Sequence, residues 1–161
     1  MAPITADEVR KGFPRMPDEV FNLWLRPEVE RAGWPQEAEE VILLSPSWNR
    51  HLRGYKPSLW AAVSWRQSEF TLASTSIEER AFEVALALAT QYNTDPSSRP
   101  RVGSLLSCLR ESRSFPKPLV FYASGEQWLL LDGQHRLAAL SIFGTESSSL
   151  RLAAWVAENA L

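Results

Sequence analysis

The residue types best suited to chemistry lie in one run, Asp132 to Arg136, between a short apolar segment and a helical pattern. Gly133 permits a sharp turn. The backbone amides of Gln134, His135 and Arg136 would then point out of a helix N-terminus, where the partial positive charge of the helix dipole binds anions. Arg136 adds a guanidinium group with fixed donor geometry, and His135 adds a donor or a proton shuttle. The run therefore predicts a phosphate ligand.

The same run also allows a purely structural interpretation. Asp132 could cap the helix by accepting from the amide of Gln134 or His135, and it could bridge to Arg136. Asp-Gly pairs are common before helices, so the two interpretations compete for the same donors. Four polar side chains between two apolar runs favour the functional one.

A strand and a helix must position this run. Residues 127–131 hold Trp and three Leu and predict a strand, whereas the apolar residues from Leu137 onward recur with a helical period. Residues 119–122 complete a hairpin, and residues 150–156 predict a last strand after a serine-rich loop. With a buried strand at residues 41–44, the sequence predicts an α/β fold in which helices pack on a small mixed sheet.

Helical signals precede the predicted sheet. Thr5 to Glu8 is a capping box, and a second helix begins near Pro17 and ends at Gly33. Residues 1–40 therefore predict an N-terminal helical extension, and residues 41–161 predict the main domain.

Three more helices are expected in the main domain. One begins at Pro57, and a brief strand is expected at residues 70–72. Ser76 to Glu79 forms a second capping box, which predicts a long, well-buried helix that runs to about Tyr92. Residues 102–109 predict a third helix with one apolar face.

Composition restricts the class of protein. The 161 residues are 45% hydrophobic and 22% charged, which suits one globular domain with a substantial core. No apolar run approaches the roughly 20 residues of a spanning helix, and the N-terminus lacks a signal pattern, so we expect a cytoplasmic protein. A single cysteine, Cys108, excludes an internal disulfide, and two histidines leave no zinc cluster.

Charge is segregated along the chain. Residues 1–40 hold nine Asp and Glu against five Lys and Arg, whereas residues 48–66 hold cations interleaved with aromatic residues and no acid. This basic stretch predicts DNA contact without sequence preference, with Trp48 and Tyr55 as stacking candidates and Trp60 packed inside. A protein interface or an ordinary amphipathic face has the same composition. The cations of the basic stretch are Arg50, Arg53, Lys56 and Arg66.

The order of elements, and not only the polar run, resembles the ParB/sulfiredoxin superfamily. The resemblance rests on residues 101–112 (RVGSLLSCLRES), 118–122 (PLVFY), 128–140 (WLLLDGQHRLAAL) and 150–156 (LRLAAWV). In that family a helix, a strand pair and a Gly-x-x-Arg turn build a nucleotide-phosphate site. Sulfiredoxins carry a reactive Cys where this chain has Gln134, so sulfinic-acid reduction is not expected.

Partition proteins of the superfamily carry a helix-turn-helix domain after the nucleotide domain, and this chain ends at Leu161, so centromere binding is not expected either. The chain resembles instead the Osa-type fertility inhibitors of conjugative plasmids. That resemblance implies ATP hydrolysis, DNA cleavage and a partner in a conjugation or type IV secretion apparatus. A cytoplasmic protein could reach the inner membrane through such a partner. The alternative is a non-catalytic module that inhibits a DNA-transfer or partition component by binding it.

The resemblance also implies roles for individual residues. Gly133 and the amides after it, including that of Gln134, would hold the phosphates of ATP or another nucleoside triphosphate. Arg136 would bind them through its guanidinium group, and His135 would contact phosphate or handle a proton. His135, Arg136 and Asp132 are the catalytic candidates, and Asp132 would be the ligand of an accompanying Mg²⁺ ion.

Two residues of the preceding helix complete the set. Arg101 occupies the place of a basic residue that opens this helix in sulfiredoxins, and Ser104 lies one turn further on. A structural pairing of Arg101 with Glu111 or with the loop is the alternative, since exposed cations at a helix start are common.

Overall fold

The computed structural model describes residues 3–34 and 45–159 and divides the chain into two compact units. The first unit comprises residues 1–65 with residues 157–161, and the second comprises residues 66–156. The first unit thus extends beyond residue 40, where the sequence places the end of the helical extension. The strand expected at residues 41–44 lies outside the described residues.

The helices of the first unit begin where the sequence predicts, with one addition. The hydroxyl of Thr5 accepts from the amide of Glu8 (3.2 Å), as a capping box requires. The second expected helix consists of three consecutive segments that end at Gly33. The additional helix is capped by Ser45 and begins at Pro46, and it was not predicted from the sequence. The helices are α1 (Ala6–Arg10), α2 (Asp18–Val20), the π-helix η1 (Phe21–Leu25), α3 (Arg26–Ala32), α5 (Pro46–His51) and α6 (Pro57–Ala62).

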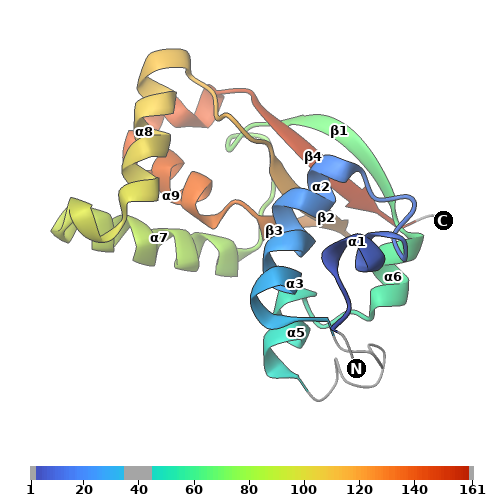
Figure 1. Ribbon diagram of the computed structural model, residues 1–161. Coiled ribbons are helices and arrows are strands. Elements are labelled where there is room, and N and C mark those ends of the chain that lie inside the picture. The colour runs from blue at the N-terminus through green and yellow to red at the C-terminus, as the bar shows by residue number, and fades with distance from the viewer. Residues whose placement is uncertain (1–2, 35–44, 160–161) are drawn as a thin grey trace. The chain divides into compact units, whose positions relative to one another are not determined.

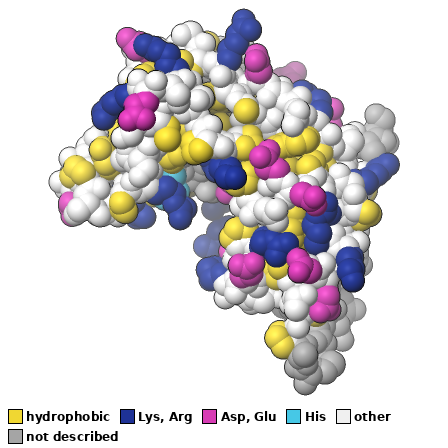
Figure 2. Space-filling view, turned by 45° about the horizontal axis from the view of Figure 1, so that its top comes forward, with side chains coloured by type: hydrophobic (Ala, Val, Ile, Leu, Met, Phe, Trp, Pro, Cys, Tyr) yellow, Lys and Arg dark blue, Asp and Glu magenta, His cyan; other side chains and the backbone are white. Residues whose placement is uncertain are grey.

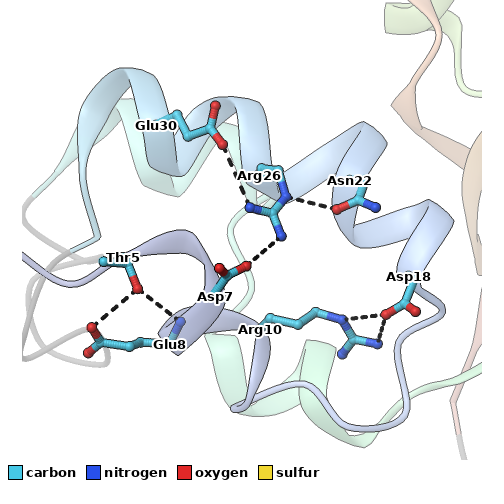
Figure 3. A network of polar contacts seen from close by, with 8 residues as sticks. All are labelled: Thr5, Asp7, Glu8, Arg10, Asp18, Asn22, Arg26 and Glu30. Carbon is cyan, nitrogen blue, oxygen red and sulfur yellow. Dashed lines mark hydrogen bonds and ion pairs between the residues drawn. The ribbon is translucent and has the colours of Figure 1, made fainter.

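Two arginine side chains join the helices of the first unit (Figure 3). Arg10 of α1 donates to the carboxylate of Asp18 at the start of α2 (2.8 Å). Arg26 of α3 donates to Asp7 of α1 (2.9 Å) and to the side-chain carbonyl of Asn22 (2.8 Å). Both acceptor carboxylates are exposed, so each pair adds at most about 1 kcal/mol to stability. Apolar burial must supply most of the stability of this unit.

Aromatic side chains fill the core of the first unit. Trp24 stacks on His51 and receives the edge of Trp60, with ring centroids 5.8 and 4.9 Å apart. Trp48 is also buried and donates its indole N–H to the carbonyl of Gly33 (3.0 Å). The prediction that Trp60 packs inside is confirmed. The prediction of Trp48 as a stacking residue is wrong, because packing against this core has removed its ring from the surface.

The four strands form one mixed sheet in the order β1-β4-β2-β3. The predicted hairpin is confirmed, with β2 antiparallel to β3, and so is the last strand, β4. The brief strand expected at residues 70–72 is displaced, because β1 lies earlier in the chain and shares only Phe70 with the expected range. β1 is an edge strand with much of its surface exposed, and its residues 66–69 are polar. The sequence therefore contains no apolar run from which this strand could be predicted. The strands are β1 (Ser64–Phe70), β2 (Leu119–Ser124), β3 (Gln127–Asp132) and β4 (Leu152–Glu158).

Three helices pack together beside the sheet in the second unit (Figure 1). They enclose a core with the inner face of the sheet, to which Phe121, Leu130 and Leu152 contribute from the strands. From the helices, Leu106 and Leu137 are fully buried in it. The helical segments are α7 (Glu79–Thr94), the 3-10 turn η2 (Pro96–Ser98), α8 (Pro100–Ser112), α9 (Gln134–Phe143) and the 3-10 turn η3 (Thr145–Ser149).

Helix α7 differs from its prediction in its start and in its burial. The capping box at Ser76 to Glu79 does not form, since the N-cap is Glu78 and no side chain caps the helix. The buried carboxylate of Glu78 instead accepts from the amide of Leu130 in β3 (2.6 Å). The buried face of α7 consists of small residues, Ala81, Ala85 and Ala89. Larger apolar residues on either side of that face are exposed, namely Phe82, Val84 and Leu86.

Candidate functional site

The polar run forms a tight turn between β3 and α9, as predicted. Asp132 ends β3, Gly133 has φ +125°, and α9 begins at Gln134. A Cβ atom on Gly133 would lie 3.1 Å from Nη1 of Arg136 and 3.3 Å from Cγ of Leu119. Both the backbone angle and the close neighbours therefore require glycine at this position.

The first amides of α9 are not used by the protein. Among the described residues, no side chain caps the helix, and the N–H groups of Gln134, His135 and Arg136 have no hydrogen-bond acceptor. The first internal bond runs from the amide of Leu137 to the carbonyl of Gly133 (2.9 Å). The structural interpretation of Asp132 as the N-cap is therefore wrong, and the helix N-terminus retains its capacity to bind an anion.

The predicted bridge between Asp132 and Arg136 is confirmed. Arg136 donates through Nη1 to Oδ2 of Asp132 at 3.2 Å, and the two side chains are 13% and 28% exposed. This contact uses one of the five N–H donors of the guanidinium group. Within the described ranges, the remaining donors make no hydrogen bond to the protein, so Arg136 can hold an anion while it stays paired.

His135 lies beside several cations. Burial is the main cause that lowers the pKa of its imidazole below the ordinary value of 6.5, and the positive charges of Arg101, Arg99 and Arg136 lower it further. The carboxylate of Asp132 acts in the opposite direction. The ring is therefore neutral at neutral pH and presents one nitrogen as an acceptor, which is the state that a general base needs.

These groups surround a cavity of about 230 Å³. Its lining residues come from the first part of α8, from the segment before β2 and from the β3–α9 turn. The lining residues are Arg101, Leu105, Pro116, Lys117, Asp132, Gly133, Gln134, His135 and Arg136. The structure thus brings together the whole predicted run and Arg101.

The two candidates on α8, Arg101 and Ser104, differ in their position relative to the cavity. Arg101 is exposed at the cavity, and no ion pair joins it to Glu111 within the described part of the chain. Ser104 is not among the described residues that line the cavity, and its hydroxyl donates to the carbonyl of Pro100 one turn back (3.2 Å). Its role as a binding residue stays a prediction.

Lys117 is the lining cation that the sequence analysis missed. It lies between Pro116 and Pro118, in the segment that precedes β2. Prolines on both sides restrict the backbone of this lysine, and this restriction is the local sequence signal that could have indicated Lys117 as a site residue. Lys117 is distant in sequence from the polar run, so its position at the cavity could not be inferred from the sequence.

A protein-bound metal has little support among the described residues. No group of three or more His, Cys, Asp or Glu side chains there could hold an ion. Asp132 is the acidic residue among the cavity-lining side chains, and it is paired with Arg136. An ion at this place would need most of its ligands from water or from a bound phosphate.

Comparisons with protein-family models, with curated proteins and with solved structures found no match. Within the described ranges, no helix is long and apolar enough to cross a membrane.

Proposed function

We propose that the second unit binds the phosphate groups of a nucleotide in the cavity at the β3–α9 turn. The observation that supports this most directly is the convergence of three unused backbone amides with three cationic side chains on one small cavity. The amides and the dipole of α9 would hold one phosphate group. Arg136 would bind it from the side, with Arg101 and Lys117 facing it from the other walls.

We extend this proposal to hydrolysis of ATP or another nucleoside triphosphate. His135 would accept a proton from the attacking water, because its imidazole is neutral and lies at the cavity. Asp132 would be the protein ligand of an accompanying Mg²⁺ ion, which fits the one or two carboxylates that Mg²⁺ takes alongside substrate oxygens. The resemblance to the Osa-type inhibitors adds DNA cleavage, inhibition of conjugative transfer and a cytoplasmic location to the proposal.

Calorimetric titration of the purified protein with ATP, with and without Mg²⁺, tests the binding step. Arg136→Ala should weaken binding about 10- to 100-fold, because a charge-assisted hydrogen bond contributes roughly 1.5 to 3 kcal/mol. The matched control is Arg110→Ala, which removes the same charge from an exposed position of α8 outside the cavity. Equal affinities for the two variants would reject the site.

The hydrolysis step needs its own readout. His135→Ala should lower phosphate release by as much as ~100-fold if the imidazole transfers a proton, with a smaller effect on ATP affinity. Unchanged turnover in this variant would remove His135 from the catalytic role.

A non-catalytic binding module is the second candidate. The pairing of Arg136 with Asp132 favours it, because it occupies the one carboxylate among the described cavity-lining residues that could hold a metal ion. Such a module would bind nucleotide without turnover and inhibit a DNA-transfer component by contact. Variants of His135 that release no phosphate but still inhibit plasmid transfer would decide in its favour.

DNA contact is a separate proposal that rests on the cations of the basic stretch and on Tyr55, which is half-buried. Arg50 and Lys56 are exposed, whereas Trp48 is buried. On the face drawn in Figure 2, basic side chains are interspersed with acidic ones. Anisotropy of a labelled oligonucleotide across a salt series tests the idea, since each cation that contacts phosphate adds roughly 1 to the log-log slope. An unchanged slope after replacing both residues with Gln would assign this surface to another partner.

A further inference from the structure

We propose that the cavity recognises a chain of phosphate groups and makes no specific contact with the nucleoside attached to it. This inference rests on the proposed function and narrows it to a ligand class, which is a linear polyphosphate. Inorganic triphosphate and the triphosphate part of any nucleotide belong to that class. The volume of the cavity, the chemistry of its walls and the arrangement of its charges each support this ligand class.

The volume of the cavity lies below the range of pockets that enclose drug-sized ligands. It is about 230 Å³, whereas such pockets range from about 300 to 1,000 Å³. The phosphate chain of a nucleotide is the part that fits this volume. The ribose and the base would then lie outside the walls that the lining residues form.

The walls also lack the groups that select a base. Proteins that bind bases stack them on aromatic rings, each worth about 1 to 3 kcal/mol. Among the nine described residues that line this cavity, none is aromatic apart from the imidazole of His135, and the uncharged remainder consists of Leu105, Pro116, Gln134 and the glycine. The exposed Gln134 carries the one neutral amide side chain of this set. The wall residues therefore give little basis for distinguishing adenine from cytosine, guanine or uracil.

The charges suit more than one phosphate group. The amides of α9 and Arg136 lie together at the β3–α9 turn, and Asp132 already balances part of the charge of Arg136. Arg101 and Lys117 come from different segments, the start of α8 and the residues before β2. A single phosphate at the turn would leave these two cations without an anion. A chain of two or three phosphates supplies further negative charge for Arg101 and Lys117.

Competition titration against a fluorescent ATP analogue tests the inference. Inorganic triphosphate, ATP, CTP, GTP and UTP should displace the analogue with dissociation constants within about threefold of one another, and adenosine should not compete. Inorganic phosphate should bind at least about tenfold more weakly than triphosphate, because it leaves two cations unpaired. Lys117→Gln should weaken inorganic triphosphate and ATP by the same factor, with Arg110→Gln as the matched control.

The outcomes separate this inference from the proposed function. If one nucleotide bound more than about tenfold tighter than the others and than inorganic triphosphate, the base would contribute specific contacts and the inference would be wrong, while the phosphate site would stand. The inference would also be wrong, with the phosphate site intact, if Lys117→Gln weakened ATP alone. If neither triphosphate nor any nucleotide bound in an Arg136-dependent way, both proposals would be wrong.

Discussion

Replacing Gly133 with alanine tests the geometry of the turn itself. The backbone at φ +125° is unfavourable for a residue with a side chain, which costs about 1 to 3 kcal/mol. The new Cβ would also lie 3.1 Å from Nη1 of Arg136 and 3.3 Å from Cγ of the buried Leu119, so we add about 1 kcal/mol for displacement of these neighbours. The expected loss of unfolding free energy is therefore about 2 to 4 kcal/mol.

Gly125 provides the matched control. It also has a positive φ of +61°, in the turn between β2 and β3, but nothing lies within 4 Å of a Cβ placed there. Gly125→Ala should therefore cost only the strain of the left-handed backbone, about 1 kcal/mol. The difference between the two variants therefore reports the contacts of Gly133 with Arg136 and Leu119 together with the greater backbone strain at φ +125°.

Urea unfolding followed by circular dichroism provides the assay. With a slope of about 2 kcal/mol per molar urea, Gly133→Ala should lower the unfolding midpoint by about 1 to 2 M and Gly125→Ala by about 0.5 M. Gly133→Ala should also weaken ATP binding, because the added carbon would push Arg136 away from Asp132 and the cavity. Equal midpoints for the two variants would refute the reasoning.

Three further predictions concern stability. The pKa of His135 in the folded state lies below the ordinary value of 6.5, so the stability that depends on its neutral ring is complete above the unfolded-state pKa and is lost as the pH falls through the folded-state pKa. In melting experiments at different pH values, wild type should therefore lose more stability than His135→Gln below about pH 6.5. Glu78→Ala should cost about 1 to 3 kcal/mol by removing the buried hydrogen bond between this carboxylate and the amide of Leu130. The exposed Glu79→Ala should cost less than about 0.5 kcal/mol, and similar losses in urea unfolding would contradict this. Trp48→Ala should destabilise the first unit by about 3 to 5 kcal/mol in the same assay, and a loss below about 1 kcal/mol would show that its ring is not core.

The β3–α9 turn could be predicted because its signals are local. A strand, a glycine and a helix that are adjacent in sequence must also be adjacent in space, and the amides after Gly133 then point outward by helix geometry alone. Lys117 reaches the same cavity through the tertiary structure, and no periodicity connects it to the turn. The sequence could therefore predict the residues that the β3–α9 turn contributes to the cavity, but not Lys117.

The errors have a common physical cause, which is that tertiary contacts override local signals. Ser76 and Glu79 match a capping box, yet Glu78 between them is buried and accepts from the amide of Leu130. In the same way, Trp48 looks like a stacking residue among cations, yet the core of the first unit had room for its ring. Composition alone does not distinguish these cases.

The contact between residues 76–78 and β3 has a consequence for the solution behaviour of the protein. β3 is the last strand of the sheet, and such a strand exposes backbone groups that can pair with another chain and start aggregation. Here Trp128 exchanges backbone hydrogen bonds with Ser76 and Glu78 (2.8 and 3.1 Å), and the carboxylate of Glu78 accepts from the next outward amide, that of Leu130. This short segment therefore shields the edge of β3 from another chain, and a protein that lost it would be expected to self-associate through that strand.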